Sequence, residues 1–101
     1  MLEPLSPAAE IFGSRVRMAR IELGLSQEAV ADLAQMHVTN YGKIERGTAN
    51  PSLLTVLRIA SVLGRDIGYF TEAITAEHLP AELTVLTAAD YIRARDTSRV
   101  S

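Results

Sequence analysis

Apolar residues recur every three or four positions up to about residue 73, and this spacing constrains the fold more than any other feature. One helical face is visible over residues 8–23, at intervals of four, three and four positions: Phe12, Val16, Ala19 and Leu23. Gly24 follows directly and is suited to the residue that ends a helix. The pattern therefore predicts a first helix over about 8–23.

Three further helices follow from the same kind of evidence. Ser26 is suited to cap a second helix that runs to about Gln35. A helix over about 52–63 ends at Gly64, and a short helix over about 67–73 follows. The residues expected to face inward are apolar: Val30, Leu33, Ala34, Leu53, Val56, Leu57, Ala60, Leu63, Ile67 and Phe70.

The stretch HVTNYGKIERGTANPS, residues 37–52, starts as a third helix but is poorly built for stability. Gly42 lies within it and is about 1 kcal/mol less favourable in a helix than alanine. The helix stops at Gly47 and is rich in short polar side chains. Such a helix suits a surface that contacts a ligand better than it suits a core.

Up to residue 73 there is no convincing strand and no repeat. Five short helices joined by connections of two to five residues predict a compact all-α domain. The length of 101 residues fits one such domain with an appended element, and 48% apolar residues are ample for a core.

Composition also limits the cellular setting. The chain has no cysteine, no apolar run near the roughly 18 residues that span a bilayer, and an N-terminus without a basic region. These features predict a soluble cytoplasmic protein without disulfides, with no signal peptide and no membrane partner.

The net charge of −2 and the pI of 5.6 are lower than is typical of DNA-binding proteins. The charge is uneven, however. Residues 1–70 hold seven basic and seven acidic groups, whereas residues 71–101 hold three basic and five acidic groups. If the chain binds DNA, the N-terminal part is therefore expected to do so.

Two structures are open for the C-terminal segment. The alternation in ELTVLT predicts a short strand at 82–86, followed by a helix capped at Thr87. Alternatively, Pro80 opens one helix over about 81–96. A lone strand or a lone amphipathic helix needs a partner, so both point to dimerisation; the alternative is a tail folded back on its own domain.

The segment GLSQEAVADLAQMHVTNYGKIERGTANPSLLTVLRIASVLG resembles the Cro- and lambda-repressor-like helix-turn-helix family, the XRE family. The resemblance covers residues 10–71 and rests on GLSQE, then IERG after fifteen intervening residues, then NPSLLTVLRIA. It implies a five-helix lambda-repressor-like DNA-binding domain at 10–73. A flexible N-terminal arm would occupy 1–9, and a C-terminal extension used for dimerisation would occupy 74–101.

In the family the second and third helices dock on DNA, and the third lies in the major groove. The resemblance places four residues against the bases: Val38, Thr39, Asn40 and Lys43. Lys43 can donate to guanine, Asn40 can bond adenine or a phosphate, and Val38 and Thr39 can pack on thymine methyl groups. The alternative is a solvated polar face.

Six residues are expected to contact the phosphate backbone: Gln27, His37, Arg46, Thr48, Asn50 and Arg17. Gln27 matches the family's glutamine at the start of the second helix, although it could simply favour the helix. Arg17 could equally be a solvated charge, and His37 an ordinary turn residue.

The resemblance assigns Arg20 and Glu45 a structural role. The family commonly has an arginine and a glutamate at these positions that pair inside the fold. An ion pair joining the first helix to the third is therefore expected, with neither residue contacting bases.

Three residues depart from the family pattern. Gln35 stands where glycine is common, so a left-handed conformation there would carry strain of about 1 kcal/mol. His37 replaces a serine or threonine and is a weaker helix cap. Gly42 either lets the helix approach DNA closely or relieves a clash.

The sequence thus predicts a sequence-specific regulator that binds double-stranded DNA as a homodimer on an inverted repeat. Repression is the default; activation and an autoregulating antitoxin remain open. A protein-interaction module using residues 72–101 is the second hypothesis. No enzyme, metal or cofactor is expected, because there is no glycine-rich phosphate loop and the two histidines lie 41 positions apart.

Overall fold

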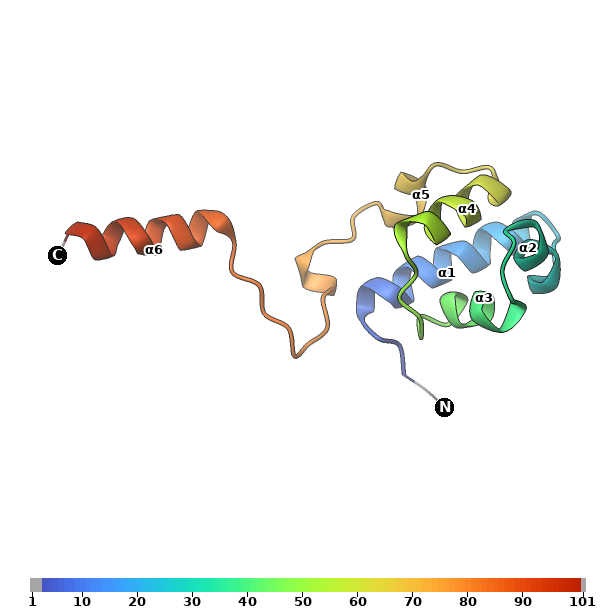
Figure 1. Ribbon diagram of the computed structural model, residues 1–101, viewed down its shortest axis with the longest axis horizontal. Helices are drawn as coiled ribbons and strands as arrows, with labels where there is room; N and C mark the ends of the chain where they lie inside the picture. Colours follow the sequence, from blue (N-terminus) through green and yellow to red (C-terminus); the bar gives the residue numbers. More distant parts are fainter. Residues whose placement is uncertain (1–2, 101) are drawn as a thin grey trace.

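The computed structural model of the chain describes residues 3–100, with side chains for residues 3–98. Within that range the chain is all-helical, which confirms the predicted fold class (Figure 1). In chain order the elements are α1 (Pro7–Glu22), α2 (Gln27–Leu33), α3 (Val38–Glu45), α4 (Leu53–Leu63), α5 (Ile67–Thr71), the 3-10 turn η1 (Ala76–His78) and α6 (Ala88–Val100). None of these helices has the length and apolar character needed to span a bilayer.

Helix α1 begins earlier than the sequence suggested. The Ser6 side chain accepts a hydrogen bond from the Ala9 amide at 3.0 Å, and Pro7 occupies the first helical position, where its fixed φ favours helix. The Leu5 amide donates to the carbonyl of Gly47 at 2.8 Å. Residues 5–9, expected to belong to a flexible arm, are therefore joined to the folded domain; Met1 and Leu2 lie outside the described residues.

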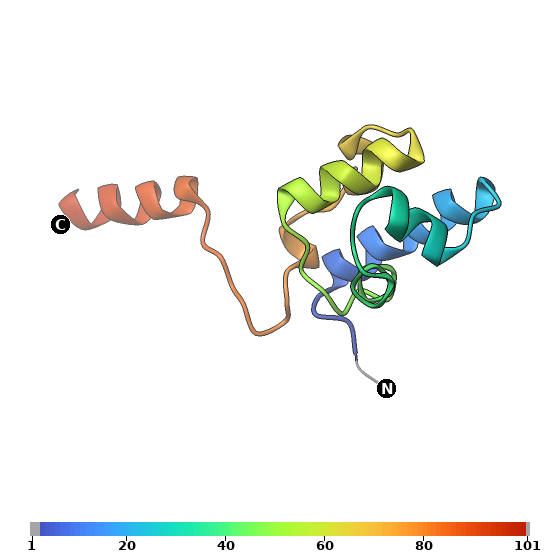
Figure 2. The same cartoon turned by 45° about the vertical axis from the view of Figure 1, so that its right-hand side comes forward.

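Helix α1 is the centre of the domain and contacts α3, α4 and α5 (Figures 1 and 2). The buried apolar side chains come from all five of the first helices and form one cluster: Phe12, Val16, Ala19, Val30, Ala31, Ala34, Tyr41, Ile44, Ile59, Ala60, Leu63 and Phe70. Phe12 and Phe70 meet edge to face, with ring centroids 6.0 Å apart, which joins α1 to α5.

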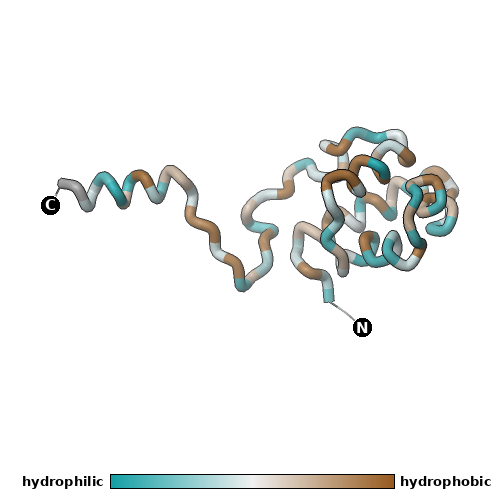
Figure 3. Tube along the Cα trace, in the orientation of Figure 1, coloured by the Kyte–Doolittle hydropathy of each residue, from teal (hydrophilic) through white to brown (hydrophobic). Residues whose placement is uncertain are grey.

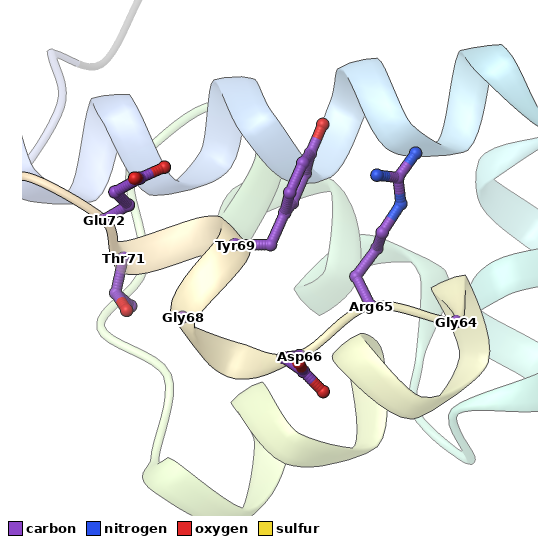
Figure 4. Close-up of a pocket in the computed structure, with 7 residues that line it drawn as sticks. All are labelled: Gly64, Arg65, Asp66, Gly68, Tyr69, Thr71 and Glu72. Atoms are coloured by element: carbon purple, nitrogen blue, oxygen red, sulfur yellow. The ribbon is translucent and has the colours of Figure 1, made fainter.

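Helix α5 is also fixed by polar contacts to α1. Arg15 donates from Nη1 to the carbonyls of Phe70 and Glu72, at 3.2 and 2.6 Å. Arg65 lies over the ring of Tyr69, 4.4 Å from its centroid, and Figure 4 shows the two side chains next to each other. They line an open hollow of about 640 Å³ on the α4–α5 connection, on the opposite side of α1 from α3.

Four leucines expected to face inward are exposed instead. Leu33 is 61% exposed, Leu53 74% and Leu57 48%, and Leu23 lies past the end of α1, half-exposed. The reason is helix length and orientation: α2 has only seven residues and buries Val30 and Ala31, while α4 buries residues nearer its C-terminus. Sequence periodicity alone could not separate these faces.

An apolar groove results between α2 and α4, with a volume of about 330 Å³. Its walls are Leu33, Ala34, Gln35, Leu54, Leu57, Arg58, Ser61 and Val62. Gln35 has a φ of 58°, the left-handed conformation considered from the sequence, and it redirects the chain from α2 toward α3.

The C-terminal extension stands away from the five-helix domain (Figure 1). Residues 82–86 form neither the expected strand nor part of a helix, and no strand lies beside them in the described chain. Helix α6 begins at Ala88, where the Thr87 hydroxyl accepts from the Asp90 amide at 3.0 Å. The cap at Thr87 is thus confirmed, and the alternative of one helix opened by Pro80 is wrong.

Side chains 81–98 are all exposed, including Leu83, Val85, Leu86, Tyr91 and Ile92. Figure 3 shows these apolar stretches along the extension, away from the domain. Residues 81–98 are therefore not folded back on the five-helix domain, and they present apolar surface to their surroundings.

Candidate nucleic-acid interface

Helix α3 has one buried face and one exposed face. Tyr41, Ile44 and Glu45 are buried against α1 and α2. The four residues expected to contact bases are exposed: Val38, Thr39, Asn40 and Lys43. The buried face fixes the helix in the domain, and the exposed face offers methyl groups, an amide and an ammonium to a ligand.

The residues expected to contact phosphates occupy several positions around α3. His37 precedes the helix without a side-chain cap bond, and Arg46 follows it; both are exposed. The Thr48 hydroxyl donates to the carbonyl of Lys43 at 3.3 Å, which holds the loop after α3 against the helix end. Arg17 is exposed on α1.

A hollow of about 290 Å³ lies between α3, the following loop and α4. It brings together Asn40 and Lys43 from α3 with Asn50 from the loop. Arg17, His37 and Arg46 are not among its walls. The structure thus groups part of the expected site, and the groups that meet here can donate to base edges or phosphate oxygens.

The hollow also contains Arg58, which sequence reasoning did not assign to the site. Arg58 donates from Nη2 to the Thr55 hydroxyl at 3.4 Å, and its Nε is buried without a hydrogen-bond partner in the part of the chain described. The signal in the sequence was a lone cation among the apolar residues of α4, three positions after a threonine on the same face.

Arg20 and Glu45 form a two-bond ion pair between α1 and α3. Arg20 donates from Nε to Oε2 of Glu45 at 2.7 Å and from Nη2 to Oε1 at 3.0 Å. The Glu45 side chain is 1% exposed and that of Arg20 is 13% exposed. A third donor, Nη1 of Arg20, bonds the carbonyl of Leu25 at 2.9 Å, so the pair also holds the connection between α1 and α2.

Glu45 accepts a further hydrogen bond from Nε2 of Gln27, at 2.9 Å. Gln27 was expected to contact a phosphate, but one of the two N–H groups of its amide donates inside the domain instead. The second N–H of that amide and Oε1 remain available, so an internal bond and a phosphate contact are compatible.

The ion pair changes the acid–base properties of its members. Burial alone would raise the pKa of Glu45, but hydrogen bonds, above all from Arg20, bring that pKa below its usual value. The bond to Glu45 raises the pKa of Arg20 further. Burial, with the Glu45 charge nearby, raises the pKa of Tyr41, whose hydroxyl has no hydrogen-bond partner at good geometry among the described residues.

Two short helices joined by a tight turn, with an exposed polar second helix held by a buried ion pair, define a helix-turn-helix DNA-binding protein. Comparison with known proteins agrees with this class. The helix-turn-helix family model matches residues 16–70, more than half of the chain. The chain therefore belongs to the helix-turn-helix family of the XRE type, whose members are DNA-binding transcription regulators and not enzymes.

Individual relatives point the same way. The chain is 31% identical over 67 residues to the SPbeta prophage-derived HTH-type transcriptional regulator YonR of Bacillus subtilis, a match covering 66% of this chain and 62% of YonR. It is 30% identical over 83 residues to the cryptic phage CTXphi transcriptional repressor RstR of Vibrio cholerae, covering 79% of this chain and 75% of RstR. The chain thus matches less than two thirds of the length of YonR.

A solved structure extends the comparison to three dimensions. The restriction-modification controller protein C.AhdI from Aeromonas hydrophila superposes with a TM-score of 0.60 at 35% identity. The match covers 61% of this chain and 94% of C.AhdI. The two proteins thus share their fold over about three fifths of this chain.

Proposed function

We propose that this chain binds a specific duplex sequence as a homodimer on an inverted-repeat operator and represses transcription there, in the cytoplasm. The observation that carries the proposal is the exposed face of α3, which presents Thr39, Asn40 and Lys43 on a helix that is held by the Arg20–Glu45 pair. Repression is favoured over activation because occupying a promoter needs no additional surface. RstR, a relative, is named a transcriptional repressor.

The four exposed residues of α3 would contact base edges in the major groove. Lys43 would donate to guanine O6 or N7, and Asn40 to adenine, while Val38 and Thr39 pack on thymine methyl groups. Gln27, His37, Arg46, Thr48 and Asn50 would contact the phosphate backbone on either side, with Arg17 as an outlying contact. The near-neutral charge of residues 1–70 implies modest non-specific affinity, so base contacts would supply most of the discrimination.

Dimerisation would be supplied by residues 74–101, with residues 10–73 as the DNA-binding domain. A single domain presents one recognition helix, so one copy would bind weakly. The apolar residues exposed along the extension support this role, since they are unburied in the single chain. Two copies would place their recognition helices on half-sites about 10–10.5 bp apart.

Selection from randomised duplex DNA at about 150 mM salt tests the proposal, because electrostatic binding alone is weak at that salt. Enrichment of an inverted repeat is the expected result. Lys43→Ala should then relax the preference at particular positions of each half-site. Folded protein that retains no duplex, or retains all duplexes equally, would contradict the proposal.

A second candidate function is contact with another protein, as in an interaction module or an autoregulating antitoxin. The observation that favours it is the apolar groove between α2 and α4, where Leu33, Leu54 and Leu57 are exposed. Leu54→Ser combined with Leu57→Ser should leave selection of DNA unchanged if the groove serves a partner. Loss of DNA selection by a folded double variant would instead assign the groove to the DNA-binding function.

A further inference from the structure

Gly42 lies in the middle of α3 although the backbone there does not require glycine. Its φ is not positive, unlike those of Gly24, Gly47 and Gly64. Alanine is the better helix former at such a position. The residue is also buried, so something other than backbone conformation accounts for the missing side chain.

The space beside Gly42 is occupied by the side chain of Arg46. A Cβ atom added at residue 42 would lie 3.1 Å from Nη1 of Arg46 and 3.8 Å from its Cζ. A residue four positions on shares the same helical face, and its side chain leans back toward the N-terminus of the helix. The Arg46 guanidinium therefore lies across α3, directly over the glycine.

The same position faces Gln27 on α2. The added Cβ would lie 3.7 Å from Oε1 of Gln27. The orientation of this amide is fixed chemically, because Glu45 is an acceptor and must receive Nε2, which it does at 2.9 Å. Oε1 is thereby turned toward residue 42, so the guanidinium of Arg46 and the amide of Gln27 converge there.

Arg46 has no ion pair or side-chain hydrogen bond within the described residues, so its donors are available to a ligand. The guanidinium fork matches a phosphate group.

Since Gly42 is covered by Arg46 and Gln27, a methyl group there would meet the guanidinium before it met DNA. Of the two roles considered from the sequence, close approach to DNA and relief of a clash, the packing favours relief of a clash with Arg46.

We propose that Gly42 is a positioning residue for DNA binding: its missing side chain lets the Arg46 guanidinium lie across α3 beside Oε1 of Gln27, where the guanidinium donates to a backbone phosphate. The proposal rests on the proposed function, in which α3 docks on duplex DNA. It predicts that stability and DNA affinity change in opposite directions when a methyl group is added at residue 42.

The test uses Gly42→Ala in the full chain, with the duplex selected by the wild-type protein as the probe. We expect an unchanged or higher melting temperature together with an affinity loss of about tenfold, the size of one lost charged hydrogen bond. The slope of log affinity against log salt should fall by about one, as it should for Arg46→Ala. In an Arg46→Ala background, Gly42→Ala should have no further effect on affinity.

Gly68→Ala is the matched control, because a Cβ at Gly68 meets nothing within 4 Å and α5 lies outside the proposed interface. It should leave affinity unchanged. An unchanged affinity for Gly42→Ala, or an equal loss with and without Arg46, would overturn the proposal.

A second measurement separates this proposal from the proposed function. NMR relaxation of the Arg46 Nε–H, in protein without DNA, should show a more mobile guanidinium in Gly42→Ala than in the wild type. Equal mobility would overturn the packing argument whether or not DNA binds. If the wild type retains no duplex, the phosphate role of Arg46 falls with the proposed function, and this measurement still decides the packing.

Discussion

Gln27 donates from Nε2 to Oε1 of Glu45 at 2.9 Å, so the first residue of α2 is bonded to the last residue of α3. Because the same carboxylate accepts two bonds from Arg20 on α1, one buried side chain links three helices. The relative orientation of α2 and α3, on which docking in the major groove depends, is therefore set partly by directional polar bonds. Apolar packing alone would restrain it less.

The first prediction concerns the stability of this network. Arg20→Ala leaves the Glu45 carboxylate buried without its main partner, and removing one member of a buried pair costs about 3–5 kcal/mol. We expect a loss of this size in the free energy of unfolding, measured by urea denaturation. A variant that melts at the wild-type temperature would contradict it.

The double variant Arg20→Met with Glu45→Met is the control that tests whether the loss in Arg20→Ala comes from the unpaired charge of Glu45. It removes both members together, so no unpaired charge is left behind, and apolar replacements of buried pairs are often close to neutral. We expect it to recover most of the stability lost in Arg20→Ala. The double variant should still lose the hydrogen bond from Gln27.

The second prediction concerns pH. The folded-state pKa of Glu45 is below its ordinary value of 4.5, so the folded state binds fewer protons than the unfolded state in acid. The stabilisation by Glu45 is therefore complete above about pH 4.5 and is lost as the pH falls through the folded-state pKa. Urea midpoints at neutral and acid pH should fall less in Glu45→Gln than in the wild type. An equal acid dependence in both proteins would show that other carboxylates carry it.

The approximate positions of the five helices of the domain could be predicted from the sequence, because helix caps, glycines and apolar periodicity are local signals. Ser26 and Gly64 lie at the helix ends where they were expected. The Arg20–Glu45 bridge was expected only through the family resemblance, since the two residues are 25 positions apart. Gln27, the third residue of this network, was expected from the sequence to point its side chain outward, toward a phosphate.

What the sequence could not give were the properties that depend on how helices cross. Leu33 and Leu57 fit a helical period yet are exposed, because no element covers that side of α2 and α4 among the described residues. Likewise, the alternation at 82–86 favoured a strand, but a strand needs a neighbour, and none is provided within the chain described. Arg58 joins the candidate interface only because its side chain lines the same hollow as Asn40 and Lys43, a proximity that no sequence pattern reveals.

The third prediction concerns Tyr41. Its hydroxyl is buried without a good hydrogen bond, and such a group costs about 1–3 kcal/mol of desolvation. Tyr41→Phe keeps the ring in the core and removes the hydroxyl. We therefore expect stability equal to the wild type or up to about 1 kcal/mol higher. A clear loss in thermal or urea denaturation would mean that the hydroxyl bonds Glu45 in solution.

The fourth prediction concerns Gly13, at the crossing of α1 and α3. A Cβ there would collide with the backbone carbonyl of Ile44 and lie 2.6 Å from the carbonyl oxygen of Glu45. Backbone cannot move aside as a flexible side chain can, so Gly13→Ala must separate the two helices. We expect a loss of about 3 kcal/mol or more, comparable to severe overpacking. Gly68→Ala, which gains the same methyl group in open space, should be neutral or stabilising by the same assay.

The last prediction concerns the C-terminal extension. Side chains 81–98 are exposed, so a chain ending at Pro80 loses no described core contact and should keep the far-UV helical signal of α1 to α5 and cooperative unfolding. If the extension forms the dimer, the shortened chain should be monomeric in light scattering, while the full chain is dimeric. The melting temperature of the full chain alone should rise with protein concentration, because association stabilises only the folded dimer.

Substitutions within the full chain test whether the exposed apolar side chains of the extension form the dimer contact, because they leave the length of the chain unchanged. Leu86→Asp with Ile92→Asp places charges on two exposed apolar positions without shortening the protein. These changes should weaken the dimer as truncation does. They should also reduce affinity for an inverted repeat far more than affinity for one half-site, because only a dimer gains from contacting two half-sites at once. A dimer that survives both changes would assign association to another surface, of which the groove between α2 and α4 is the clearest apolar alternative.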